Sequence, residues 1–491
     1  MTLPPLWRNR LITVGAAALA LWLGAKLAEQ AYFWPILITG TLSLLSLRRL
    51  LALPVEGLLL GLALFGYLAG NRGFAQISLA GNFPLLPAEF VLLIGGLILG
   101  MQSAFGRQGI VQRDALNLAI AIWIGVGSVR LGFDLKAYGF SAMRDFALVY
   151  YAAFFFLAQY AARDDRTERW LQGCLLAGFA AMLVLYPLVD HFADFFLSTL
   201  TLRGSPLIFF KGDLVGTMLM AGGVLVYMRL ESYHRPLATV ASLVLIGAGL
   251  TTNNRASLVG LFTVTLLLLL GRRWKFAATQ ATAAVVAGIA ILFIANLTNL
   301  SWRQTPLFGV YERVASLTDP LGQQRYSGED TYNKGDNNRF RAVWWRTVFD
   351  ETIGGNPVFG LGFGTDLAAG FIREYYPEQS DEFDARSPHN VMLTTFGRTG
   401  IVGLVPLLLI SGLLAQRVIG AARSGKPTLG LWCAAWVILV SACFGVVLEG
   451  PMGAVMFWSI LGLAHGRDSL NSQSDITVTP PLHAGPKTTS A

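Results

Sequence analysis

Charged side chains are scarce in this sequence. Only 13% of its 491 residues are Asp, Glu, Lys or Arg, and 54% are hydrophobic, whereas a soluble protein of this length carries about a quarter charged residues. Apolar runs of about 20 residues recur from end to end, and each is long enough to cross the roughly 30 Å hydrocarbon core of a bilayer. The composition excludes a soluble globular protein and predicts an all-α polytopic membrane protein.

Patterns that bind metals or nucleotides are also lacking. The cysteines are three in number and lie inside apolar runs, and an odd count there argues against a disulfide scaffold. No His, Asp or Glu cluster has metal-ligand spacing, and the sequence contains neither a Walker A loop nor a Rossmann fingerprint. We therefore expect no metal, no cofactor and no nucleic-acid partner.

The apolar runs amount to fourteen candidate spans, which predicts about 12–14 transmembrane helices. Their centres lie near residues 20, 39, 62, 95, 123, 153, 179, 220, 244, 262, 286, 402, 438 and 457. The first run follows Arg8 and Arg10 and has no convincing small-residue cleavage site. We therefore interpret it as a retained span and not as a signal peptide.

The basic residues favour one orientation of these spans. When the N-terminus is placed in the cytoplasm, the loops on that side carry most of the Lys and Arg, as the positive-inside rule requires. The alternate loops are poor in basic residues, apart from a few such as Arg203 and Lys211. The pattern predicts a multi-pass protein with both termini in the cytoplasm. The basic residues of the inner loops include Arg48, Arg49, Arg107, Arg113, Arg163, Arg169, Arg229, Arg235, Arg272, Arg273, Lys275, Arg417 and Lys426.

One long polar segment, residues 296–388, separates the eleventh and twelfth spans. It holds nine Lys and Arg against thirteen Asp and Glu, so its net charge is −4, and the rest of the chain carries +12. The stretch FRAVWWRTVFDETI (340–353) has the apolar spacing of a helix, and GNPVFGLGFGTD (355–366) is typical of a glycine-rich turn. A segment this long is usually functional or disordered, and its aromatic residues favour a folded structure.

These features divide the chain into four predicted regions. Residues 1–295 form spans 1–11, residues 296–388 form a large outer loop, and residues 389–466 form spans 12–14. The tail, residues 467–491, is rich in Ser, Thr and Pro, a composition that predicts disorder.

His389 stands where the outer loop meets the twelfth span. Ser387 suits an N-cap and Pro388 the first helical position, which places His389 and Asn390 in the first turn. The positive end of a helix dipole disfavours imidazolium, and a neutral imidazole can accept a proton from a hydroxyl. The alternative is a polar residue that lies at the boundary between water and lipid.

Arginines on the same face are candidates for binding phosphate. Arg255 follows a short outer turn at the mouth of a span, where a cation must be paired or hydrated; a snorkelling interface residue is the alternative. In the loop helix Arg339 and Arg346 share a face, and Arg341 is turned from them by roughly 160°. A planar guanidinium donates in pairs to phosphate oxygens, although any of these loop arginines can instead form salt bridges in the acidic loop.

A series of alternate glycines follows the loop helix. Its backbone N–H groups can face an anion, or the series can form a simple turn. The glycines concerned are Gly360, Gly362 and Gly364.

Together these residues resemble the O-antigen ligase and O-antigen polymerase superfamily of bacterial envelope glycan enzymes. The ligase signature is a His, then Asn, Ser or Gln, then nine residues, then G-x-x-G. Here His389 and Asn390 precede Gly400 and Gly403 at that spacing. The stretch RFRAVWWRTVFDETIGGNPVFGLGFGTD (339–366) is similar too, with an arginine before a tryptophan-containing helix and then P-x-x-G-x-G-x-G.

The resemblance implies a fold and a reaction. Members look like GT-C-type membrane glycosyltransferases that transfer a preassembled glycan from an undecaprenyl-diphosphate carrier, without a metal or nucleotide sugar. The acceptor is a hydroxyl of a glycolipid or glycan on the periplasmic face of the bacterial inner membrane. By residue, the resemblance implies that His389 is the general base and that Arg255 holds the diphosphate, together with Arg341 or its rival Arg339. The implied supporting residues are Asn390, Gly400, Gly403 and Arg346.

Arg398 departs from the family pattern, because many relatives have an acidic residue at this position. Nine helical residues separate it from His389, which predicts the opposite helix face, where Arg398 can pair with Glu449 or with another helix. In the leading hypothesis, in which the protein is a ligase, we expect Arg255, His389 and one loop arginine to line one cavity.

Other functions stay open at this point. An O-antigen or exopolysaccharide polymerase and a protein O-oligosaccharyltransferase share the donor chemistry and differ in the acceptor. A flippase or other transporter belongs to a different class, and it favours ionisable residues near mid-bilayer and repeated halves. The distinctive polar residues of this chain instead gather on one face of the membrane.

Overall fold

The chain is almost entirely helical, which confirms the all-α class. A computed structural model describes residues 14, 18–26, 33–78, 86–105, 111–202, 204–252, 254–319, 321–324, 329–375 and 386–477. Within this part of the chain the only strands are β1 (Thr201–Leu202) and β2 (Ser205–Pro206), which pair as a short antiparallel hairpin.

Seven of the described helices are long and apolar enough to cross a membrane, which confirms a polytopic membrane protein. Because water is absent from the bilayer core, a helix that satisfies its own backbone groups is the natural form for such runs. The seven are α5 (Pro87–Phe105), α6 (Ala115–Tyr138), the broken helix of α7 (Phe140–Asp145), α8 (Ala147–Tyr150) and α9 (Ala153–Ala161), α10 (Asp165–His191), α11 (Gly212–Leu230), α14 (Trp274–Leu297) and α18 (Val391–Ser424). Four shorter apolar helices are α3 (Val55–Ala69), α12 (Arg235–Thr251), α13 (Arg255–Leu270) and α19 (Leu429–Ala442).

The remaining described elements lie at the ends of the chain and in its connections. They are α2 (Phe33–Leu51), α4 (Arg72–Ala75), the π-helix η1 (Phe195–Thr199), the 3₁₀-helix η2 (Trp302–Gln304), α15 (Pro306–Leu317), α16 (Glu329–Gly355), α17 (Ala369–Tyr375) and α20 (Pro451–Thr477). The predicted tryptophan helix of the loop is α16, and it is followed by the predicted glycine turn.

The predicted disorder of the tail is wrong for residues 467–477, because α20 continues to Thr477. Two buried side chains anchor the middle of this helix, where the predicted tail begins: His465 lies 2.9 Å from Asp114, and Asp468 lies 3.2 Å from Lys426. Residues 478–491 lie outside the described part of the chain.

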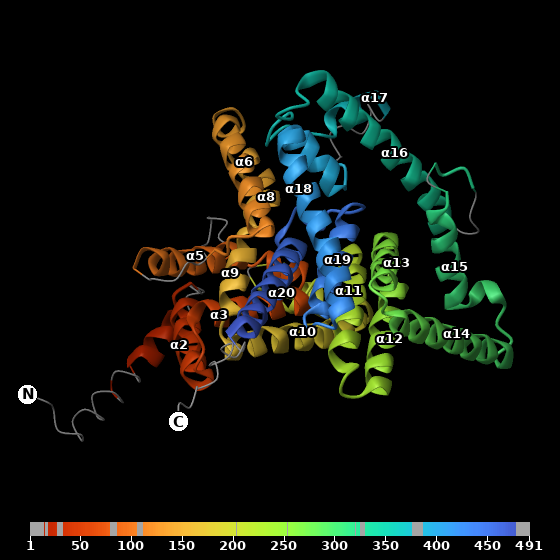
Figure 1. The fold of residues 1–491 in the computed structure, drawn as a ribbon, viewed down its shortest axis with the longest axis horizontal. Coiled ribbons are helices and arrows are strands. Elements are labelled where there is room, and N and C mark those ends of the chain that lie inside the picture. Colours follow the sequence, from red (N-terminus) through yellow and green to blue (C-terminus); the bar gives the residue numbers. More distant parts are fainter. Residues whose placement is uncertain are drawn as a thin grey trace, which may run out of the picture.

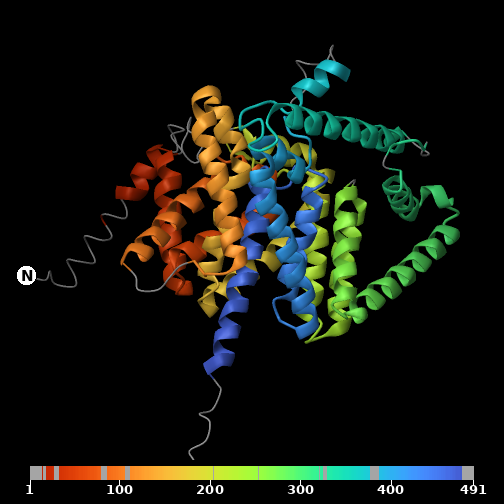
Figure 2. The same ribbon diagram turned by 45° about the horizontal axis from the view of Figure 1, so that its top comes forward.

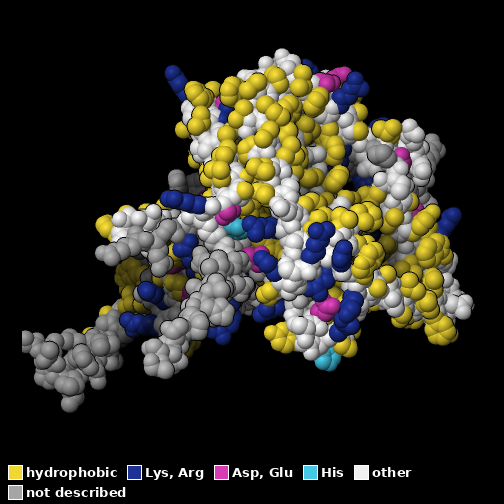
Figure 3. Space-filling model, viewed as in Figure 1, with side chains coloured by type: hydrophobic (Ala, Val, Ile, Leu, Met, Phe, Trp, Pro, Cys, Tyr) yellow, Lys and Arg dark blue, Asp and Glu magenta, His cyan; other side chains and the backbone are white. Residues whose placement is uncertain are grey.

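The hydrophobic core lies where α9, α11, α19 and α20 pack together near the middle of the bundle. Its largest fully buried side chains include Trp123, Trp432 and Trp458. On the face shown in Figure 3, hydrophobic side chains cover the upper part of the bundle, and Lys and Arg gather below them.

The chain from α14 to α16 leaves this core and returns to it. In Figures 1 and 2, α14 runs outward from the lower end of α12 and α13, and α15 and α16 lead back over the top toward α18. α16 packs against α18 and α17, around buried Trp344, Val348, Leu367 and Phe371. This arch places the loop arginines beside the beginning of α18.

Candidate active site

His389 precedes α18 instead of lying in its first turn. The helix is capped by Asn390, whose Oδ1 accepts hydrogen bonds from the N–H groups of Met392 and Leu393 at 3.0 and 3.2 Å. His389 has φ of +56°, a left-handed conformation that is unfavourable for a side chain of this size. The predicted cap at Ser387 is wrong, because the Ser387 hydroxyl donates to a carboxylate on another segment.

That carboxylate is Glu449, between α19 and α20. Ser387 Oγ and Thr394 Oγ1 both donate to its Oε1, at 2.5 and 2.9 Å. Burial raises the pKa of Glu449, and the two hydroxyls and the positive charge of Arg398 oppose that increase. Glu449 therefore ties the turn before His389 to α18 and to the α19–α20 connection.

In the G-x-x-G motif, Gly400 allows the glycine turn to enter a break in α18, and Gly403 leaves room for the side chain of Thr399. Gly400 has φ of +63° inside the helix, and a Cβ there would lie 2.2 Å from the carbonyl oxygen of Val358. The N–H groups of the next two residues donate to the carbonyls of Pro357 and Val358. A Cβ at Gly403 would lie 1.9 Å from Thr399 Oγ1. Side chains at either glycine would disrupt this packing.

The alternate glycines of the turn all have positive φ, and the backbone amides beside them do bind anions. The N–H of Phe363 donates to Asp134 Oδ2 at 2.7 Å, and the N–H of Gly364 donates to Asp145 Oδ2 at 3.0 Å. The anions are thus carboxylates of the protein itself, and they fix the turn against α6 and α7. The glycines are Gly360 (φ +73°), Gly362 (φ +101°) and Gly364 (φ +90°).

His389 lines a polar cavity of about 260 Å³, called here the histidine cavity. Its polar walls come from α7, from the turn before α18, from α18 and from the α19–α20 connection. They include Arg144, Asp145, Arg386, His389, Arg398 and Glu449.

Arg398 lies in the wall of this cavity as an ion pair. Its Nη2 is 2.8 Å from Asp145 Oδ2, and its Nη1 donates to the carbonyl of Gly362 at 3.1 Å. Arg398 is only 2% exposed, and a buried charge of this kind requires such a partner. The expectation that Arg398 faces away from His389 is wrong, because His389 precedes the helix and does not follow its rotation. Its ion-pair partner is Asp145 and not Glu449.

The surroundings of His389 keep its ring neutral. Burial, followed by the positive charges of Arg341 and Lys211, lowers the pKa of His389 to about 4, although Asp213 opposes them. The ring centroid lies 5.6 Å from that of Trp344. Near pH 7 the imidazole is therefore uncharged and has a lone pair that can accept a proton.

Two arginines converge on a neighbouring cavity of about 330 Å³, called here the arginine cavity. Arg255 is the first residue of α13, after the N-cap Asn254, and its Nη1 donates to Ser316 Oγ at 3.2 Å. Arg341 extends from α16, and its Nη1 donates to the carbonyl of Phe444 at 2.8 Å. Burial lowers the pKa of the Arg341 guanidinium, so an anion that enters this cavity meets a cation with little water around it.

The other two arginines of α16 lie elsewhere. Arg339 donates to the carbonyl of Gly322 at 2.8 Å. Arg346 is exposed and lies 3.5 Å from Asp350. Neither lines the histidine cavity or the arginine cavity. The structure therefore favours Arg341 over Arg339 as the partner of Arg255.

The expected single cavity is divided into two neighbouring ones. Trp345 lines the arginine cavity, and its indole N–H donates to the carbonyl of Pro388, the residue before His389, at 2.6 Å. Phe444 lines the arginine cavity and Val446 the histidine cavity. The two arginines thus share one cavity, and the histidine lies in the other.

A segment of the chain that contributes residues to both cavities matches a known family. Residues 240–408 match the sequence model of the O-antigen ligase family. This segment is therefore similar to the O-antigen ligase family, which supports the resemblance to the O-antigen ligase and polymerase superfamily. No curated protein matches the chain.

The O-antigen ligase segment begins in α12 and ends in α18. It contains Arg255, Arg341 and His389, and it also contains the glycine turn and the break that receives it. The walls of the histidine cavity extend beyond this segment, to α7 on one side and to Glu449 on the other.

The structure adds residues to the candidate site that sequence reasoning missed. Arg144 and Asp145 lie in a predicted span, where a pair of charges in an apolar run is itself a signal of function. Lys211 is one of the few basic residues on a predicted outer loop, and it lies 3.5 Å from Asp213. Among the described residues, no group of three or more His, Cys, Asp or Glu is placed to hold a metal ion.

Proposed function

We propose that the protein is an O-antigen ligase-type glycosyltransferase. It transfers a preassembled glycan from undecaprenyl diphosphate to an acceptor hydroxyl of a glycolipid or glycan. The observation that carries this proposal is the pair of neighbouring cavities. Two arginines converge in one, and a neutral histidine lies in the other. The family match supports the class of reaction.

In this proposal the arginine cavity holds the diphosphate of the donor. The planar guanidinium groups of Arg255 and Arg341 donate in pairs to phosphate oxygens. The charge on the leaving diphosphate increases as its bond to the sugar breaks. Positive groups that are already in place stabilise that charge most in a site with little water.

The histidine cavity then receives the acceptor. The acceptor oxygen forms a bond to the anomeric carbon, and the bond between that carbon and the diphosphate oxygen breaks, leaving both electrons on the diphosphate. The acceptor proton passes to His389. Because the pKa of His389 is about 4, the imidazole is a weak base that is always unprotonated near pH 7, and it releases the proton readily after transfer.

The charge pattern of the loops supports a location for this reaction. Cytoplasmic loops of membrane proteins are rich in Lys and Arg, and the 296–388 loop carries a net −4. We place this loop and both cavities on the periplasmic face of the inner membrane, with both termini in the cytoplasm. The donor glycan is then presented outside the cytoplasm, and membrane lipids surround the site.

The test is product analysis with the purified protein in lipid. The donor is an undecaprenyl-diphosphate glycan, and the acceptors are a lipopolysaccharide core, a second lipid-linked repeat unit and a protein with surface Ser residues. Glycan on the core supports the ligase, whereas longer lipid-linked chains identify a polymerase and glycan on the protein identifies an O-oligosaccharyltransferase. If intact donor crosses the bilayer and no product forms, the protein is a flippase and not a glycosyltransferase.

A further inference from the structure

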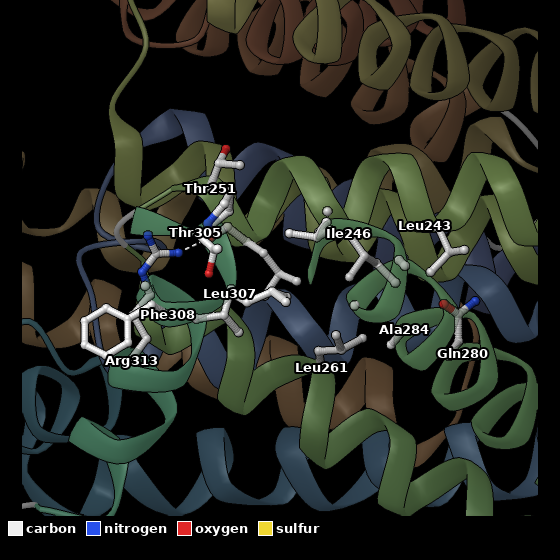
Figure 4. A pocket seen from close by; sticks show the side chains of 18 of the residues that line it. Leu243, Ile246, Thr251, Leu261, Gln280, Ala284, Thr305, Leu307, Phe308 and Arg313 are labelled. Carbon is white, nitrogen blue, oxygen red and sulfur yellow. Dashed lines mark hydrogen bonds between the residues drawn. The ribbon is translucent and has the colours of Figure 1, made fainter. Parts of the chain in front are cut away.

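A third cavity is separate from both of these. It has a volume of about 1170 Å³ and lies between α12, α13, α14 and α15. We call it the α12–α15 groove. Figure 4 shows Arg313 at one end and Gln280 at the other, with Ile246 and Leu261 between them. Its walls are mainly apolar, so it suits a long hydrocarbon chain better than a sugar.

Along this groove, one face of α14 has no protein partner among the residues that the structure describes. Small residues at helical spacing, Ala284, Ala287 and Gly288, face the groove, and a Cβ added at Gly288 would meet nothing within 4 Å. Their neighbours Val285 and Ile289 are bulky, are 60% and 62% exposed and do not line the groove. The small residues leave space on the groove side of a helix that is long and apolar enough to cross a membrane.

One end of the groove is polar, and not all of its hydrogen-bond donors have a partner among the described residues. Arg303 and Arg313 both line it, with Glu312 beside them. Arg313 Nη1 donates to the carbonyl of Leu250, but its buried Nε has no hydrogen-bond partner among the described residues. A donor that is buried without a partner is costly. This end therefore suits a ligand that brings an oxygen acceptor and carries a hydrocarbon chain behind it.

The polar end adjoins the arginine cavity. On α15, Arg313 faces the groove, and Ser316 lines the arginine cavity and accepts from Arg255. Three helical residues separate them, a rise of about 4.5 Å. On the other side, Thr251 lines the groove just before Arg255 begins α13. A molecule whose phosphates lie against Arg255 can therefore continue into the groove.

We propose that the α12–α15 groove binds the polyprenyl tail of the lipid-diphosphate donor, with Arg313 at the junction between tail and diphosphate. This inference rests on the proposed function, because it takes the donor from there. Continuity with the arginine cavity favours the donor over a bystander phospholipid. The groove binds the ground state and the transition state equally, so it acts on the KM for the donor and leaves kcat unchanged.

The test compares two tryptophan substitutions at adjacent positions of α14. Ala284→Trp fills the groove, and Val285→Trp places the same side chain on the lipid-facing side. Each is assayed with an undecaprenyl donor and with a donor whose prenyl tail is too short to enter the groove. Ala284→Trp should raise the KM for the undecaprenyl donor about tenfold, which corresponds to the lost burial of about two methylene groups.

The short donor should show no difference between Ala284→Trp and wild type, and Val285→Trp should behave as wild type with both donors. An equal KM increase for both tail lengths, or no increase, would overturn the proposal. If Ala284→Trp loses activity with both donors and has a lower melting temperature, the substitution has destabilised the protein. Gly288→Trp, which fills the same groove, then repeats the test.

A second readout does not require transfer. An undecaprenyl diphosphate that carries a photoreactive group near the end of its tail is irradiated with the wild-type protein, and the labelled peptides are identified by mass spectrometry. Labels on α12 and α14 support the groove even if no transfer is found, in which case only the proposed function fails. Labels on other helices would refute the proposed tail site. As a control, a photoreactive phospholipid is tested in the same way; if it labels the groove and undecaprenyl diphosphate does not displace it, the proposed tail site is also refuted.

Discussion

The dependence of transfer on pH tests the chemistry assigned to His389. Its pKa is about 4 instead of 6.5, and that difference corresponds to about 3.4 kcal/mol in favour of the neutral imidazole. A general base acts in its unprotonated form. The rate should therefore rise with pH through about 4 and stay flat from about pH 5 to pH 8, with no inflection near 6.5.

Lys211→Gln separates the causes of this low pKa. Burial is the largest cause of the lowered pKa of His389, and the charges of Arg341 and Lys211 follow. Removing one cation therefore raises this pKa only part of the way to 6.5. The acidic limb of the profile should move to higher pH, and Lys211→Arg, which keeps the charge, should match wild type.

The assay is the initial rate of transfer at saturating donor and limiting acceptor, measured across this pH range in a detergent that does not titrate. Recovery of full activity on return to pH 7 shows that the protein has not unfolded at low pH. A wild-type limb centred near pH 6.5, or profiles of Lys211→Gln and wild type that coincide, would refute the reasoning.

Three further predictions follow from the geometry. Arg341→Gln should weaken donor binding about 10- to 100-fold, since a hydrogen bond to a charged group contributes about 1.5–3 kcal/mol. Arg346→Gln, a change on the exposed face of α16, should leave the Kd measured by titration unchanged. Gly400→Ala should destabilise the protein by about 1–3 kcal/mol because of its backbone conformation, whereas Gly412→Ala, in open space on α18, should keep its melting temperature. Asp145→Asn should cost about 3–5 kcal/mol, because it leaves a buried arginine without its charge partner; a melting temperature equal to wild type would contradict this.

The parts of the fold and site that were predictable depend on local pattern. Apolar runs of span length predicted the all-α membrane class, and helical spacing predicted α16. On that helix Arg341 is turned away from Arg339 and Arg346, and of the three it alone lines the arginine cavity, but the sequence left the choice between Arg339 and Arg341 open. The resemblance identified Gly400, because the family motif has a glycine at a fixed distance from the histidine, and the structure places this glycine at a break in α18 that receives another loop.

The parts that were not predictable depend on contacts between distant segments. Nothing near Ser387 indicates that its hydroxyl binds Glu449 and leaves Asn390 to cap the helix. The pairing of Arg398 with Asp145 joins α18 to α7, some 250 residues apart in the sequence, and no periodicity reports it. The division of the site into two cavities follows from Trp345 and its bond to the turn before His389, which is again a tertiary contact.

The central claim is that binding and proton transfer belong to different cavities. The most direct test measures donor binding and glycan transfer side by side for His389→Ala and Arg341→Gln. The account predicts that His389→Ala binds the lipid-diphosphate donor with a wild-type Kd but transfers no glycan, and that Arg341→Gln loses donor affinity. Normal transfer by His389→Ala, or an equal loss of donor affinity in both variants, would contradict it.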